Sequence, residues 1–181
     1  MSLVELIAQA DERGLAASGL ACLDRCVPVL GGDDDVLRPL WARLAEGGDW
    51  RGPLAEARSA LGAAPGTGTS HEAATLTRRM LDAVPAGPSG AEIREWADGC
   101  SVAALQVHRL LDTAPTDGTD AVSTLTSPLV AAELRRQVRI LELLANKGAG
   151  PAGGLRQALD VSMEGRRVLR AVVSRRSRVR L

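Results

Sequence analysis

The chain has 181 residues, of which 45% are hydrophobic, and its 22 basic side chains balance its 22 acidic ones. This composition excludes a disordered acidic or basic tail, since such chains combine low hydrophobicity with a high net charge. Helix formers dominate: 29 Ala and 26 Leu stand against 15 Val and three Ile, with no Phe and no Tyr. We therefore expect a single all-α domain, an irregular bundle of about seven or eight short helices.

The same composition limits where the protein works. Its apolar runs are far shorter than the about 18–20 residues of a membrane span, and Glu5 interrupts the only candidate signal segment. Three cysteines are an odd number in a chain large enough to fold without disulfides, which favours reduced thiols. We expect a cytoplasmic protein that does not enter a membrane.

Helix starts and stops are marked clearly in the first half of the chain. A capping box, Ser2 with Glu5, opens a first helix that Gly14 ends, and a second helix runs from about Leu15 towards Pro28. Three aspartates at 33–35 favour the start of a third helix. A short fourth helix begins at Pro53, because proline is accepted in the first turn.

Two further capping boxes, Thr69 with Glu72 and Ser89 with Glu92, open the fifth and sixth helices. The sixth has the longest apolar stripe, so we expect it to be the central helix. Ser127-Pro128 starts a seventh helix, and the last begins near Leu155. The valines of the last helix follow one face, which predicts that this face is buried: Val161, Val168, Val172 and Val179.

The neutral net charge conceals an uneven distribution. From Leu129 onward there are 12 basic and four acidic residues, whereas residues 1–128 carry 10 basic and 18 acidic ones. We predict three parts: a helical body with an acidic surface (1–112), an exposed linker (113–127), and a basic C-terminal helix pair with an arginine-rich tail (128–181), which forms a semi-independent hairpin. Such asymmetry indicates either an acidic partner or docking of the basic end on the acidic body.

Seven arginines near the C-terminus are the candidate partner- or nucleic-acid-binding residues. Three lie opposite the valine stripe and four form the tail: Arg166, Arg167, Arg170, Arg175, Arg176, Arg178 and Arg180. A solvated basic helix end, complementing the helix dipole, is the simpler interpretation of the same residues.

The segment 134–175 resembles a degenerate helix-turn-helix of bacterial regulators. Leu155-x-x-Ala-Leu-x-Val-Ser162 is similar to the second helix and turn, with Ser162 as the N-cap of a recognition helix. The resemblance implies that Arg166, Arg167 and Arg170 contact the major groove or phosphates of DNA. Asp160 stands where the turn usually has Gly, and Arg166 stands where a buried apolar residue is usual.

No pattern of catalytic or metal-binding residues is evident. Cys22 and Cys26 share a helix face, but two further metal ligands are missing, so buried free thiols are the simpler reading. His108 is placed at the edge of the core, with Asp112 one turn away but no nucleophile beside it. The loop at 66–70 lacks the lysine of a phosphate-binding loop. If Trp50 is exposed, it marks an interface.

The sequence therefore predicts no catalytic residue, no cofactor and no metal. We expect a non-enzymatic interaction or regulatory protein that docks a partner protein, or a second copy of itself, through its basic C-terminal helices. A DNA-binding regulator is the alternative. An enzyme whose site assembles from residues far apart in the sequence is a second alternative.

Overall fold

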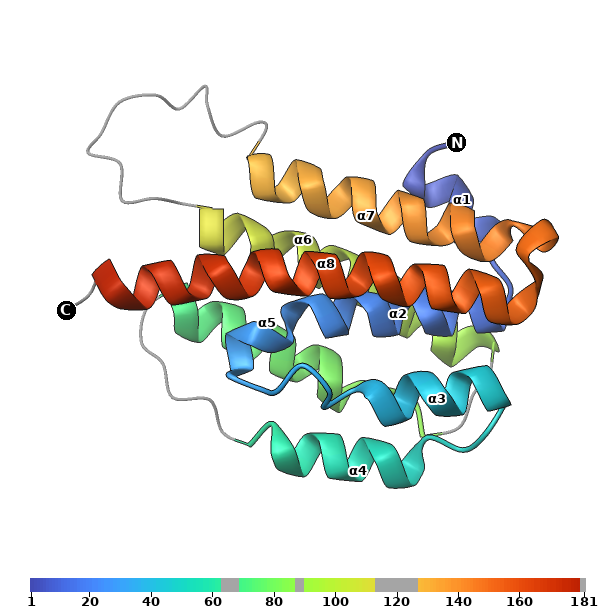
Figure 1. Ribbon diagram of the computed structural model, residues 1–181, viewed down its shortest axis with the longest axis horizontal. Coiled ribbons are helices and arrows are strands. Elements are labelled where there is room, and N and C mark those ends of the chain that lie inside the picture. The colour runs from blue at the N-terminus through green and yellow to red at the C-terminus, as the bar shows by residue number, and fades with distance from the viewer. Residues whose placement is uncertain (63–68, 87–89, 113–126, 180–181) are drawn as a thin grey trace.

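The computed structural model describes residues 1–62, 69–86, 90–112 and 127–179 (Figure 1). Within these ranges the chain forms eight α-helices and two 3₁₀ helices without any strand, so the expected all-α fold is confirmed. None of these helices combines the length and apolar character of a bilayer-crossing segment. The elements are α1 (Leu3–Gln9), α2 (Glu12–Cys26), η1 (Val27–Leu30), α3 (Arg38–Glu46), α4 (Arg51–Ala60), α5 (Thr69–Asp82), α6 (Gly90–Asp112), α7 (Pro128–Ala145), η3 (Lys147–Ala149) and α8 (Gly150–Val179).

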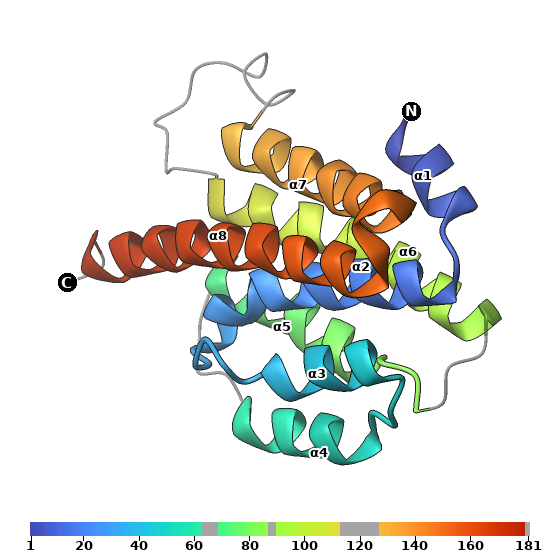
Figure 2. The ribbon, with the colours of Figure 1, turned by 45° about the vertical axis from the view of Figure 1, so that its right-hand side comes forward.

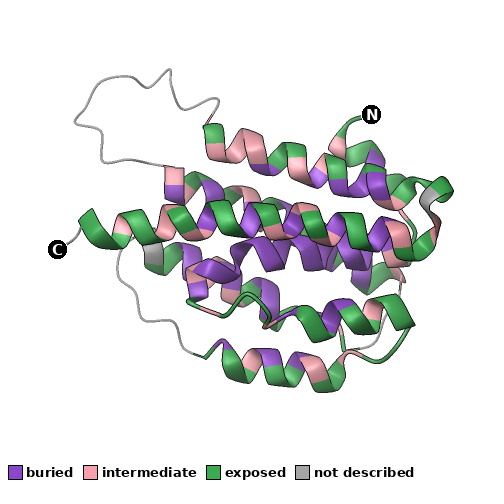
Figure 3. Cartoon of the chain, viewed as in Figure 1, coloured by how far each residue is buried: buried purple, intermediate pink, exposed green. Residues whose placement is uncertain are grey.

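Helix α2 is the centre of the bundle. Every residue from Gly14 to Cys26 is buried, and α2 packs against α5, α6, α7 and α8 (Figure 3). The expectation that α6 is central was wrong, because α6 has one buried face and one exposed face. The small side chains of α2, mainly Ala, Gly, Ser and Cys, allow neighbouring helices to approach it from all sides.

Helices α7 and α8 pack against each other and then onto the body, α7 against α6 and α8 against α2 (Figures 1 and 2). Gly154 allows this close pairing, since a Cβ there would lie 3.0 Å from the Leu143 carbonyl oxygen. Ile140, Leu155 and Leu169 belong to the same apolar core as the residues of α2 and α6. The C-terminal pair therefore shares one core with the body; most of the expected linker, residues 113–126, lies outside the described ranges.

The buried face of α8 agrees only in part with the one that the valines predicted. Val161 and Val172 are half-buried and pack against the core. Val168 is 37% exposed and Val179 is 82% exposed. The buried face instead carries small and polar residues as well as leucines: Gly154, Leu155, Ala158, Ser162, Gly165, Arg166 and Leu169. The difference arises because the neighbouring helix α2 presents Asp24 and Arg25 to this region, so polar and small side chains fit it better than valines.

Side-chain hydrogen bonds define several helix ends. Ser2 and Glu5 form the predicted capping box, and Ser127 accepts from Val130 N at the start of α7. Arg94 of α6 donates to the Ile7 carbonyl at the end of α1. The three aspartates did not start a helix as expected, because α3 begins after a turn, at Arg38. Ser89 and residues 66–68 lie outside the described ranges.

Candidate functional site

Arg166 is buried between α8 and α2. Its Nη1 donates to Asp24 Oδ1 at 2.7 Å, and its Nε lies 3.4 Å from Asp34 Oδ1. Ser162, one turn earlier on α8, donates its hydroxyl to Asp24 Oδ2 at 2.8 Å. Burial raises the pKa of Asp24, although Arg166 and Ser162 both favour its charged form. Arg166 therefore joins two helices of the bundle and is not presented to a partner.

Arg170 forms the next contact along α8. Its Nη2 donates to Asp34 Oδ1 at 2.7 Å and to the Gly32 carbonyl at 2.8 Å. Asp34, which belongs to the aspartate run expected to start a helix, thus accepts from Arg170 and lies beside Arg166. Two of the seven candidate arginines therefore form ion pairs with aspartates of the body. For these two, the charge asymmetry reflects docking of the basic end on the acidic body, one of the two alternatives that the sequence indicated.

The other candidate arginines lie further from these acids. Arg167, Arg175 and Arg178 are exposed and form no ion pair with any described residue. Arg176 is half-buried and donates to the Leu110 carbonyl at the end of α6, at 2.9 Å. Arg180 lies outside the described ranges. Among the candidate arginines, the exposed charge is thus carried by Arg167, Arg175 and Arg178.

The turn of the expected helix-turn-helix is absent. Residues Gly150–Val179 form one continuous helix, so Ser162 caps no recognition helix. The Ser162 hydroxyl bonds instead to Asp24 and to the Ala21 carbonyl within the helix packing. Position 160, where this turn favours Gly, is Asp, which continues the helix. Of the three arginines expected in a DNA groove, only Arg167 is exposed.

A second buried ionic cluster joins α2, α6 and α7. Arg25 Nη2 and Nε donate to the two Glu133 carboxylate oxygens at 2.6 and 2.8 Å, and both side chains are 0% exposed. Gln137 donates to Glu133 at 3.0 Å and accepts from Ser101 at 2.6 Å. His108 Nε2 lies 3.6 Å from Glu133. The carboxylate is therefore surrounded by hydrogen-bond donors, as a buried charge requires.

The charges of this cluster depend on one another. Burial opposes ionisation of Glu133, but the adjacent Arg25 outweighs it and lowers the pKa of the carboxyl. Burial lowers the pKa of His108, which Glu133 only partly offsets. The expectation that His108 sits at the edge of the core was wrong, since it is 1% exposed. Its Nδ1 bonds the Ala104 carbonyl at 2.7 Å, and Asp112 instead bonds residues at the start of α7.

The cysteines and tryptophans lie mainly in the core. Cys22, Cys26 and Cys100 are free and buried, and burial raises the pKa of Cys22 to about 12, so the thiol is protonated at neutral pH. The described residues contain no group of three or more His, Cys, Asp or Glu side chains that fits a metal ion. Trp50 is half-buried and packs edge-on against Trp96, with ring centroids 6.1 Å apart.

The charges buried in the two ionic clusters were missed in the sequence. Asp24, Arg25 and Glu133 were not singled out, although an Asp-Arg pair within a helix of small residues is itself a signal that charges are buried in pairs. Comparison of the chain with protein-family models, curated proteins and solved structures found no match.

Proposed function

We propose that the protein is a non-enzymatic cytoplasmic interaction protein. It docks an acidic protein surface through the distal part of α8, residues 167–179. The observation that carries this proposal is that the candidate arginines of α8 fall into two groups, one paired with the body and one exposed. Arg166 and Arg170 are neutralised by the body, whereas Arg167, Arg175 and Arg178 are exposed without an ion pair to any described residue. After Glu164 the described part of α8 contains no further acid.

Exposed valines accompany this charge. Val168 and Val179 lie on the same helix as the three arginines. A partner surface with acidic side chains around an apolar patch would match both features: the arginines would steer association, and the valines would add buried apolar area. Three buried, free cysteines are consistent with a reducing compartment such as the cytoplasm.

The test compares two sets of three substitutions. The first variant carries Arg167→Gln, Arg175→Gln and Arg178→Gln. The matched control removes the same charge from exposed arginines elsewhere on α7 and α8, with Arg135→Gln, Arg139→Gln and Arg156→Gln. Binding of a fluorescent poly-glutamate and of a mixed-sequence DNA duplex is measured by anisotropy across a salt series. Self-association is measured by sedimentation velocity.

We expect poly-glutamate to bind wild type and to bind the first variant about three- to tenfold more weakly, because three exposed ion pairs contribute a few tenths of a kcal/mol each. The control variant should retain most of the affinity. Tighter binding of the DNA, with the same loss in the first variant, would replace the proposal with nucleic-acid binding. Equal losses in both variants, or no binding and no self-association, would contradict it.

A further inference from the structure

We infer that a cavity between α2, α3 and α6 is a binding site for a small apolar carboxylate. The cavity has a volume of about 420 Å³, within the usual range for small-molecule sites. It lies away from the distal part of α8, so this inference does not depend on the proposed docking function. Its walls come from the first turns of α2, the end of α3 with the following turn, the residues after α5, and α6.

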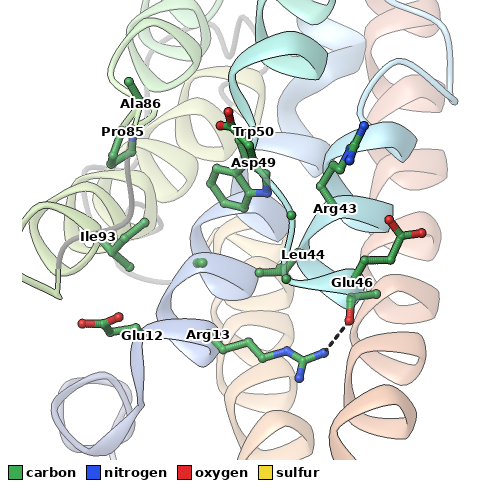
Figure 4. Close-up of a pocket in the computed structure, with 14 residues that line it drawn as sticks. Glu12, Arg13, Arg43, Leu44, Glu46, Asp49, Trp50, Pro85, Ala86 and Ile93 are labelled. Carbon is green, nitrogen blue, oxygen red and sulfur yellow. Dashed lines mark hydrogen bonds between the residues drawn. The ribbon is translucent and has the colours of Figure 1, made fainter.

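Apolar side chains form most of the wall. Figure 4 shows the Trp50 indole projecting between Ile93 on one side and Leu44 on the other. Ala16 and Pro85 complete this surface. Trp96 supports the Trp50 ring from the core, at an interplanar angle of 73°. The indole is therefore held in place before any ligand arrives, and it offers a flat apolar surface to a hydrocarbon chain or an aromatic ring.

Arg13 gives the cavity its polar end. Its Nη2 donates to the Ala45 carbonyl at 3.3 Å, and this bond fixes the guanidinium at the wall (Figure 4). Its Nε is buried and has no hydrogen-bond partner, and no described carboxylate forms an ion pair with Arg13. The half-buried Arg13 side chain thus lines the cavity without a counter-charge, and a ligand carboxylate is the acceptor that suits a guanidinium best.

The other charges at the cavity do not supply that acceptor. Asp49 already accepts from the Arg51 amide and guanidinium, at 3.0 and 2.9 Å. Figure 4 shows Glu12 pointing to the side opposite Arg13. Glu46 and Arg43 are exposed at the rim. The apolar wall together with the unpaired Arg13 defines the ligand: a monocarboxylate with an aliphatic or aromatic body.

Three probes with the same eight-carbon chain test this inference: octanoate, 1-octanol and octylammonium. Binding is measured by calorimetry and by intrinsic fluorescence, which reports tryptophan alone because the chain has no Tyr and no Phe. We expect octanoate to bind one site and to bind more tightly than octanol. Arg13→Gln should weaken octanoate binding by about ten- to a hundredfold, the usual value of hydrogen bonds to a charged group. The same substitution should leave the affinity for octanol unchanged.

Two matched variants complete the experiment. Arg43→Gln removes a rim charge and should leave octanoate affinity within about threefold, since an exposed charge contributes little. Arg13→Lys keeps the charge and should retain part of the preference for octanoate. If Arg13→Gln does not fold, the relative affinities of wild type for the three probes still test the inference. Failure to bind octanoate, equal binding of octanol, tighter binding of octylammonium, or a preference that survives in Arg13→Gln would overturn the inference.

Discussion

Two adjacent residues of the buried helix α2 connect the body to the C-terminal helices. Asp24 pairs with Arg166 of α8, and Arg25 pairs with Glu133 of α7. Because α2 presents an acid to α8 and a base to α7, exchanging α7 and α8 would place charges of the same sign together. A Cβ at position 165 would lie 2.5 Å from Arg25 Cδ, so Gly165 leaves room for the arginine beside α8. We expect these pairs to determine how α7 and α8 are placed on α2.

The pair between Arg25 and Glu133 gives the first prediction. Glu133→Gln leaves the guanidinium buried without a counter-charge, so we expect the free energy of unfolding to fall by about 3–5 kcal/mol. Glu142→Gln is the control on the same helix: its pair with Arg139 is 3.9 Å long and exposed, so the loss should stay below about 1 kcal/mol. Urea denaturation measures both, and similar losses in the two variants would contradict the prediction.

His108 gives the second prediction, which concerns pH. Its pKa is lowered in the folded state because burial opposes its charge, and it faces Glu133, Arg25 and Arg136. The unfolded chain therefore binds the proton more readily, and stability falls as pH drops below the ordinary pKa of 6.5. The slope attributable to this one group is at most about 1.4 kcal/mol per pH unit.

Urea midpoints at several pH values between 7.5 and 5 measure this effect. His108→Gln should flatten the dependence in that window. His71 is the other histidine and is exposed on α5, so His71→Gln should leave the wild-type dependence intact. The prediction fails if wild type and His108→Gln lose stability in parallel.

At the scale of the elements, local signals predicted helices better than they predicted faces. Ser2 and Ser127 mark helix starts through contacts within four residues, and both were found where expected. The buried face of α8 was predicted only in part, because Arg166 on that face pairs with Asp24, which lies 142 residues away in the sequence. Periodicity of apolar residues cannot reveal a face that is buried through ion pairs and small side chains.

The contact between α2 and α6 gives a prediction at this scale, from two glycines. A Cβ on Gly19 would lie 2.6 Å from the Trp96 ring, whereas a Cβ on Gly99 would meet nothing within 4 Å. Gly19→Ala should therefore destabilise the protein by about 1–3 kcal/mol through overpacking. Gly99→Ala should stabilise it by about 0.5–1 kcal/mol through helix propensity. Thermal and urea unfolding test the opposite signs, and a shared sign would contradict the packing described.

At the scale of the whole molecule, the fold brings part of the basic C-terminal charge onto acidic side chains of residues 1–112. The basic C-terminal part places two arginines on Asp24 and Asp34 of the acidic body. The candidate site was predictable only in its residue types, because which arginines remain exposed depends on where the aspartates lie in space. The sequence does not contain that information in any local pattern.

The shared core leads to the last prediction, on cooperativity. Leu155 and Leu169 of α8 belong to the same apolar cluster as Leu20 of α2, and two buried ion pairs join the same elements. Separating α7 and α8 from the body would expose unpaired charges on both sides, so we expect one two-state transition. All three tryptophans lie within the first 96 residues, whereas far-UV circular dichroism also reports the 18 and 30 residues of α7 and α8. The urea transitions from fluorescence and circular dichroism should therefore coincide. Separate midpoints would instead indicate that the C-terminal helix pair folds as a semi-independent hairpin.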